Sequence, residues 1–186
     1  MKHHISLPLS HEDAKMLRAG DSVLLTGILY TARDAAHKRM TEQLSMGLPL
    51  PFDPQNAAIY YVGPSPAPAG MPLGSAGPTT SSRCDKYTPP LLEKGVTVLI
   101  GKGKRSPDVQ GALRQFGGVY LATTGGAGAM LARCIRSAKV IAYEDLGTEA
   151  VRELYVENFP AVVIHDCHGG DWYSIARQSY LESLQK

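Results

Sequence analysis

The sequence is poor in cysteine, which argues against a disulfide-bonded protein and against a metal site built from closely spaced cysteines. Three cysteines, Cys84, Cys134 and Cys167, are widely spaced along 186 residues. An odd, small number argues against a disulfide framework, and the spacing lacks close metal-ligand pairs such as C-x2-C. Three thiolates would suit an iron–sulfur cluster with one open iron, but scattered free thiols are the simpler interpretation.

Long apolar runs and a strong charge of one sign are lacking as well. No apolar stretch approaches the ~20 residues that span a bilayer, and none of signal-peptide length follows the start. The net charge is +2, and the basic residues stand singly instead of forming a stripe along one element. We therefore expect a cytoplasmic protein that binds neither membrane nor nucleic acid.

What the sequence does contain is typical of a globular α/β protein. Its hydrophobic content of 44% suits one domain over residues 1–186 with a buried core. Apolar, β-branched runs alternate with segments of helical composition. Strands are predicted at residues 22–30, 57–62, 95–104, 119–124, 139–143 and 161–164. Helices are predicted at residues 11–17, 31–46, 82–92, 106–116, 130–137, 148–154 and 172–184.

Residues 77–86 (GPTTSSRCDK) form the most unusual stretch of the chain. A proline and four hydroxyl side chains precede Arg83, so the segment can cap the helix predicted to follow. A helix that begins here aims free N–H groups and a partial positive charge at one point, which suits a carboxylate or phosphate. The alternative is a capped surface helix with an incidental arginine.

Two further cations follow predicted strands. Arg33 lies in the first turn of the helix after strand 22–30, where Thr31 is a plausible N-cap with Asp34 three residues on. A cation is poorly placed at a helix N-terminus, which indicates that a negative group comes near. Lys102 follows the apolar part of the predicted strand 95–104 and stands between two glycines. If these strands are neighbours, Arg33, Arg83 and Lys102 converge and can clamp a small dicarboxylate; otherwise they are three solvated side chains.

Two other motifs are weaker. Gly126-Ala127-Gly128 supplies two glycines of a dinucleotide fingerprint, but Leu131 stands where the third is needed, so tight strand-to-helix packing is favoured. The loop 165–170 contains His165, Asp166 and His168 in metal-like spacing. One loop without a second clear ligand segment is more typical of a turn that caps the last helix.

Four segments together resemble a known family: residues 26–27 with 31–39, then 60–64, 77–83 and 100–103. They are similar to the C-terminal domain of class I, iron–sulfur-dependent fumarases. The same domain is a separate β subunit in two-subunit fumarases and in L-tartrate dehydratase. The match extends over nearly the whole chain, including residues 143–147 and 165–170.

The resemblance implies a swivelling β/β/α-type domain, with a mixed sheet flanked by helices, and a reversible hydro-lyase acting on fumarate. It also implies that the [4Fe–4S] cluster and its three cysteine ligands belong to a partner α subunit in a hetero-oligomer. On that basis Cys84, Cys134 and Cys167 are not cluster ligands. L-Tartrate dehydratase is an alternative activity, and a non-catalytic anion-binding or structural subunit is an alternative of another class.

Residue by residue, the resemblance matches Arg33, Arg83 and Lys102 to the family's substrate-carboxylate binders and Thr79 to its proposed catalytic base. An open iron on the partner would act as a Lewis acid on the C2 hydroxyl while a base removes a C3 proton. An alkyl hydroxyl hardly ionises near neutral pH. Thr79 therefore either has a lowered pKa or positions the true base or a water.

Overall fold

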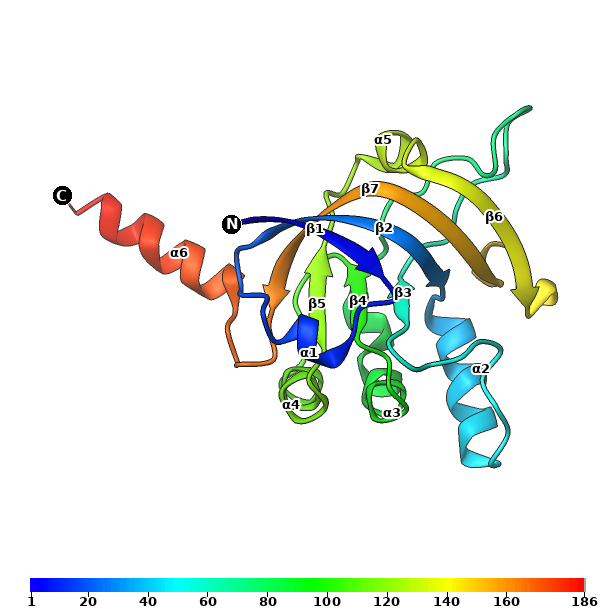
Figure 1. Cartoon of the computed structure of the whole chain (residues 1–186), viewed down its shortest axis with the longest axis horizontal. Helices are drawn as coiled ribbons and strands as arrows, with labels where there is room; N and C mark the ends of the chain where they lie inside the picture. The colour runs from blue at the N-terminus through cyan, green and yellow to red at the C-terminus, as the bar shows by residue number, and fades with distance from the viewer. Residues whose placement is uncertain (186) are drawn as a thin grey trace.

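Two long, curved strands, β2 (Ser22–Thr31) and β7 (Val151–His165), organise the chain and pair antiparallel with each other. The computed structural model describes residues 1–185. In it, β1 (Lys2–Leu7) pairs parallel with β2, and β6 (Ile135–Ala142) pairs antiparallel with β7. These four strands form a layer that arcs over the rest of the molecule (Figure 1).

The second layer is a parallel sheet in the order β2-β3-β4-β5. Its inner strands are short: β3 (Ala58–Tyr60), β4 (Val98–Gly101) and β5 (Val119–Ala122). The far end of β7 pairs antiparallel with β5, so the sheet curls back on itself through β7 and β2. Because β2, β3, β4 and β5 are parallel, their carboxyl ends share one edge.

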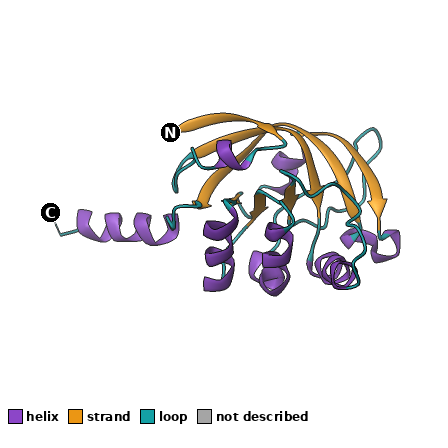
Figure 2. Ribbon diagram, turned by 60° about the horizontal axis from the view of Figure 1, so that its bottom comes forward, coloured by secondary structure: helices purple, strands orange, loops and turns teal. Residues whose placement is uncertain are grey.

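Three helices cover the outer face of this parallel sheet (Figures 1 and 2). They are α2 (Asp34–Ser45), α3 (Thr88–Glu93) and α4 (Pro107–Phe116). The shorter elements are α1 (His11–Ala14), α5 (Gly128–Ala132) and the 3-10 helices η1 (Ser81–Tyr87) and η2 (Glu144–Glu149). Helix α6 (Trp172–Ser183) extends away from the sheets and buries none of its residues.

The alternation of side chains along β3 shows how two cores form. Ala58 and Tyr60 point into the core between the two sheets, where the Tyr60 ring packs edge-on against Phe159 at 5.2 Å between centroids. Ile59 and Tyr61 point the other way, into the core between the parallel sheet and the helices. Every strand buried on both sides reads as a continuous apolar run. The β/β/α arrangement, a mixed sheet with flanking helices, is therefore confirmed.

One predicted helix, 148–154, is wrong, and another, 130–137, is helical only as far as Ala132. Residues 148–154 end η2 and begin β7, and residues 130–137 end α5 and begin β6. Glu and Leu favour helix locally, but Leu154 and Val156 are buried between the sheets and β7 is paired on both edges. Tertiary pairing overrides the weak local preference here.

The predicted N-cap is also wrong. Thr31 is the last residue of β2, and its buried hydroxyl donates to the Ala150 carbonyl at 3.2 Å and accepts the Arg152 N–H at 3.0 Å. Helix α2 begins at Asp34, with Arg33 in the N-cap position and no hydrogen bond from its own side chain. Among residues 1–185, no helix has both the length and the apolar composition needed to cross a membrane.

Candidate functional site

Two of the predicted cations, Arg33 and Lys102, follow strands of the same parallel sheet, β2 and β4, with β3 between them. Arg33 lies two positions after the end of β2, and Lys102 directly follows β4. Between them, β3 ends at Tyr60 and the chain continues to Gly63. Since these strands are parallel, the loops that follow them lie along one edge, the usual ligand edge of such sheets. We call this edge the carboxyl edge.

The hydroxyl-rich segment 77–83 runs across the carboxyl edge from the end of β3 to the end of β4. The Thr79 N–H donates to the Tyr61 carbonyl at 2.7 Å. Thr80 forms a parallel bridge with Lys102, and the Ser81 N–H donates to the Lys102 carbonyl at 3.0 Å. The structure thus places Thr79 and Lys102 on neighbouring, hydrogen-bonded backbone.

The predicted anion site at a helix N-terminus is not formed as expected. Residues 81–87 form a short 3-10 helix, η1, and Thr80 at its N-cap makes no side-chain hydrogen bond. The N–H groups of Thr79 and Ser81 are already bonded to carbonyls of neighbouring strands. The α-helical part of the predicted helix 82–92 begins only at Thr88. Close pairing with the sheet edge therefore consumes donors that a free helix start would have offered.

Arg83 lies on the exposed side of η1, which packs against α2. Within the described residues its guanidinium has no carboxylate partner. Lys102 is half-buried, and its ammonium passes over the turn after β5: a Cβ added to Gly125 would lie 3.8 Å from Nζ. The Lys102 side chain therefore lies against this turn.

Arg33 already has a negative neighbour within the chain. Its Nη2 lies 3.4 Å from Oε1 of Glu149, and its Nε lies 3.7 Å from Oδ1 of Asp34. The other oxygen of Glu149 accepts the Ala35 N–H at 2.9 Å, so Glu149 caps α2 in place of the expected threonine. A Cβ on Gly63 would lie 2.9 Å from Arg33 Nη1. The cation beside the helix N-terminus is thus compensated from η2.

A buried histidine, His37, holds the Arg33 backbone through a hydrogen bond. His37 is fully buried, packs edge-on against the Tyr61 ring, and has Nδ1 at 2.8 Å from the Arg33 carbonyl. Burial lowers the pKa of His37 to about 4, so the ring is neutral at pH 7, and its Nδ1–H donates to the Arg33 carbonyl. His37 was not predicted as a site residue, because nothing in its local pattern signals burial.

A second missed residue, Arg105, holds η1 to the sheet. Its side chain is 0% exposed and lies between the rings of Tyr61 and Tyr120, with the guanidinium carbon 5.1 and 4.9 Å from their centroids. Its Nε donates to Asp85 of η1 at 2.7 Å, and its Nη2 donates to Thr88 at 2.8 Å. A buried guanidinium needs this full set of partners. Its only local signal is a basic residue before a helix cap, which does not indicate burial.

The cysteines of this chain do not fit a cluster. Cys84 is fully buried in the core between sheet and helices, and burial raises the pKa of its thiol to about 12. Cys134 follows α5, and Cys167 lies in the loop after β7. Within residues 1–185 no three His, Cys, Asp or Glu side chains are grouped closely enough to hold a metal ion.

The loop after β7 is built as a turn. Asp166 accepts backbone N–H groups of Ala19 at 2.9 Å, His168 at 2.9 Å and Gly170 at 2.8 Å. Burial alone would raise the pKa of Asp166, but these three donors together hold it below its usual value. Asp171 then caps α6 by accepting the Tyr173 N–H.

Within the sequence 126–128, Gly126 has a φ of +84° in an open turn, and Gly128 serves packing. The Gly128 carbonyl accepts the Ala76 N–H at 3.0 Å, and a Cβ on Gly128 would lie 2.8 Å from the Gly77 nitrogen. Two backbones approach closely here, which requires glycine.

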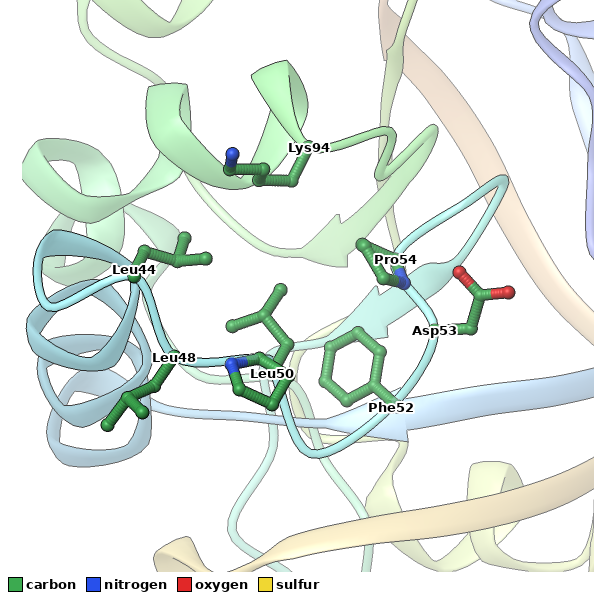
Figure 3. Close-up of a pocket in the computed structure, with 9 residues that line it drawn as sticks. Leu44, Leu48, Leu50, Phe52, Asp53, Pro54 and Lys94 are labelled. Carbon is green, nitrogen blue, oxygen red and sulfur yellow. The ribbon is translucent and has the colours of Figure 1, made fainter.

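A pocket of about 530 Å³ lies away from the carboxyl edge, between the end of α2, the loop 47–54 and Lys94 (Figure 3). It contains none of Arg33, Thr79, Arg83 and Lys102. A second pocket of about 470 Å³, beside the proline-rich loop 63–74, contains none of them either.

The fold and the edge together define a class: a β/β/α domain that presents basic and hydroxyl side chains at the carboxyl ends of its parallel strands. The family model described as "Fumarase C-terminus" matches residues 2–176, and the chain belongs to this family. The resemblance drawn from its segments is thereby confirmed.

Individual relatives agree with this assignment. The chain is 42% identical over 151 residues to "Fumarate hydratase 1, mitochondrial" of Leishmania major, covering 80% of this chain and 28% of that protein. It is 40% identical to "Fumarate hydratase class I, anaerobic" of Escherichia coli, with the same coverage of 80% and 28%. It is 35% identical over 184 residues to a "Putative L(+)-tartrate dehydratase subunit beta" of Methanocaldococcus jannaschii, covering 96% and 94%. The chain thus spans little more than a quarter of these fumarate hydratases and nearly all of the tartrate dehydratase subunit.

Proposed function

We propose that this chain is the substrate-binding half of an iron–sulfur-dependent hydro-lyase that converts fumarate reversibly to L-malate. It acts as a β subunit with a cluster-bearing α subunit, in a hetero-oligomer. The observation that supports this most is the carboxyl edge: Arg33 and Lys102 follow strands of one parallel sheet, Thr79 lies in the segment that crosses this edge, and Arg83 lies on η1, which continues that segment.

In this proposal the cations bind the substrate's two carboxylates. Arg83, without a carboxylate partner in the described part of the chain, offers a bidentate donor, and Lys102 offers a movable point charge. Arg33 is held by Glu149 on one side and keeps its buried Nε without a hydrogen-bond partner in the described residues. These positive charges also stabilise the negative charge that develops on the carboxylate next to C3.

Thr79 is assigned to the proton-abstracting side. Its backbone is fixed by Tyr61, while its hydroxyl makes no hydrogen bond within residues 1–185 and is free to meet a substrate or a water. A general base must lie within hydrogen-bond reach of the proton that it removes. Thr79 meets this condition if the diacid bridges Arg83 and Lys102.

The [4Fe–4S] cluster is assigned to the α subunit, because the three cysteines of this chain lie apart and Cys84 is buried. Bound there, the cluster supplies a Lewis acid for the C2 hydroxyl. We expect this chain alone to be colourless and inactive, and its anaerobically assembled complex to be brown and to hydrate fumarate.

The test compares two exposed basic residues of the same 3-10 helix in that complex. Arg83→Ala should lower kcat/KM for fumarate by about 100-fold, the loss of a bidentate charge-assisted pair, with the cluster absorbance unchanged. Lys86→Ala, the matched control, should leave kcat/KM unchanged. Intact turnover in Arg83→Ala would favour a non-catalytic subunit that only closes the partner's cluster.

A tartrate dehydratase β subunit is the second candidate, because the similar M. jannaschii subunit has nearly the same length as this chain. The ratio of kcat/KM for L-malate to that for L-tartrate, measured on the same complex, decides between them. We expect the ratio to favour L-malate.

A further inference from the structure

Ser81 and Tyr120 connect segment 77–83 to the loop that carries Lys102. The Ser81 N–H donates to the Lys102 carbonyl at 3.0 Å, and the Lys102 N–H donates to Ser81 Oγ at 3.1 Å. Ser81 Oγ also lies 2.9 Å from the Tyr120 hydroxyl, which donates to the Gly103 carbonyl at 2.9 Å. Ser81 and Tyr120 therefore link the backbone of Lys102 to the backbone of the next residue, Gly103, through a chain of hydrogen bonds.

The hydrogen positions follow from the donors available. The Gly103 carbonyl can only accept, so the Tyr120 hydroxyl donates its single hydrogen there. Ser81 must then donate to the Tyr120 oxygen, and its own oxygen accepts from the Lys102 N–H. Each hydroxyl thus accepts one bond and donates one. Ser81 and Tyr120 are both 0% exposed, so no water can replace either partner without a cavity opening.

Packing holds the connection in place. A Cβ on Gly101 would lie 2.0 Å from Ser81 Oγ, so the hydroxyl sits directly against the backbone of β4. The Tyr120 ring is held on one side by the buried Arg105 guanidinium and stacks on His165 at 5.7 Å between centroids. Burial raises the pKa of Tyr120, so its hydroxyl remains a donor at neutral pH.

We propose that Ser81, supported by Tyr120, is a positioning residue that fixes the Lys102 ammonium relative to Thr79. This inference rests on the proposed function, in which Lys102 binds a substrate carboxylate and Thr79 faces the reacting carbon. A displacement of about 1 Å at such a site can cost about 100-fold in rate. Ser81 itself touches no substrate in this account.

The activity test is a double-mutant cycle on the assembled, cluster-loaded complex. Ser81→Ala should lower kcat/KM for fumarate by about 10- to 100-fold and raise KM. Lys102→Ala should cost about 100-fold, and the double variant should be no worse than Lys102→Ala within about 3-fold, because Ser81 acts through Lys102. Losses that multiply in the double variant would overturn the proposal.

Tyr120→Phe keeps the ring and removes one hydroxyl. It provides a second test in case the Ser81→Ala variant fails to fold. We expect a smaller loss, about 3- to 10-fold, that again disappears in the Lys102→Ala background. Thr97→Val is the matched control: it removes a buried hydroxyl directly before β4, at the far end from Ser81, that donates to the Gly95 carbonyl. It should lower the urea midpoint without changing kcat/KM; an equal loss of activity in Thr97→Val would mean that Ser81 matters only for stability.

A second measurement does not depend on turnover. In the 186-residue chain, Ser81→Ala should make the Lys102 amide exchange with deuterium at least about 10-fold faster while the Leu99 amide, inside β4, keeps its wild-type rate. Unchanged protection at Lys102 would overturn the positioning role. If the wild-type complex shows no hydro-lyase activity but this exchange difference appears, the proposed function fails and the structural connection stands.

Discussion

His37 should make the stability of this protein fall at mildly acidic pH. Burial lowers the pKa of His37 in the folded protein to about 4, whereas an unfolded histidine keeps the ordinary value of 6.5. Between these two values the unfolded chain binds a proton that the folded chain does not. The contribution to stability is therefore fully present above pH 6.5 and is lost as the pH falls toward 4.

The magnitude follows from the difference between the two pKa values. At about 1.4 kcal/mol per pKa unit, the full loss is about 3 kcal/mol, and about 2 kcal/mol of it has occurred by about pH 5. The non-titrating variant His37→Asn places an amide nitrogen where Nδ1 donates to the Arg33 carbonyl. Other titrating groups are the same in both proteins, so they cancel in the comparison.

The assay is urea unfolding of wild type and His37→Asn at about pH 7.5 and about pH 5. The variant is expected to be less stable at the higher pH, since it loses packing against Tyr61. Its further loss on acidification should be about 2 kcal/mol smaller than that of wild type. Equal pH dependence in the two proteins would refute the assignment of a buried, neutral His37.

Three other predictions concern buried residues that support the carboxyl edge. Arg105→Met should destabilise the fold by about 3–5 kcal/mol in urea unfolding, because Asp85 loses the cation bonded to it, and adding Asp85→Asn should restore part of the loss; a change below about 1 kcal/mol would contradict the pairing. Gly101→Ala should cost about 1–3 kcal/mol and lower turnover, since its Cβ would lie 2.0 Å from Ser81 Oγ, and wild-type activity and melting temperature would contradict that contact. Cys84 should remain unmodified by iodoacetamide in the native protein, as judged by mass spectrometry, because it is fully buried and its thiol pKa is raised to about 12.

The parallel part of the sheet could be predicted because its strands are buried on both faces. Residues 95–104 and 119–124 contain apolar runs too short for helices, and the structure has β4 and β5 there. Strand β7 could not be found in the same way. Its first half has helical composition, and only its pairing with β2 on one edge and β6 on the other makes it a strand.

The candidate site was predictable to the extent that it follows strand ends. Arg33 and Lys102 each come within two positions of the end of an apolar strand. A cation at a helix start indicated a negative neighbour, and Glu149 of the same chain is one. The supporting pairs were not predictable. Arg105 meets Asp85 across 20 positions and Ser81 meets Tyr120 across 39, and no local pattern signals contacts at such distances.

The central claim is that one small diacid is bound at the carboxyl edge. The most direct measurement is a structure of the anaerobic complex with fumarate or L-malate bound. The account predicts carboxylate oxygens within about 3 Å of nitrogens of Arg33, Arg83 and Lys102, with the Thr79 hydroxyl facing C3. A diacid bound with its carboxylates on other residues, leaving these three side chains in solvent, would contradict it.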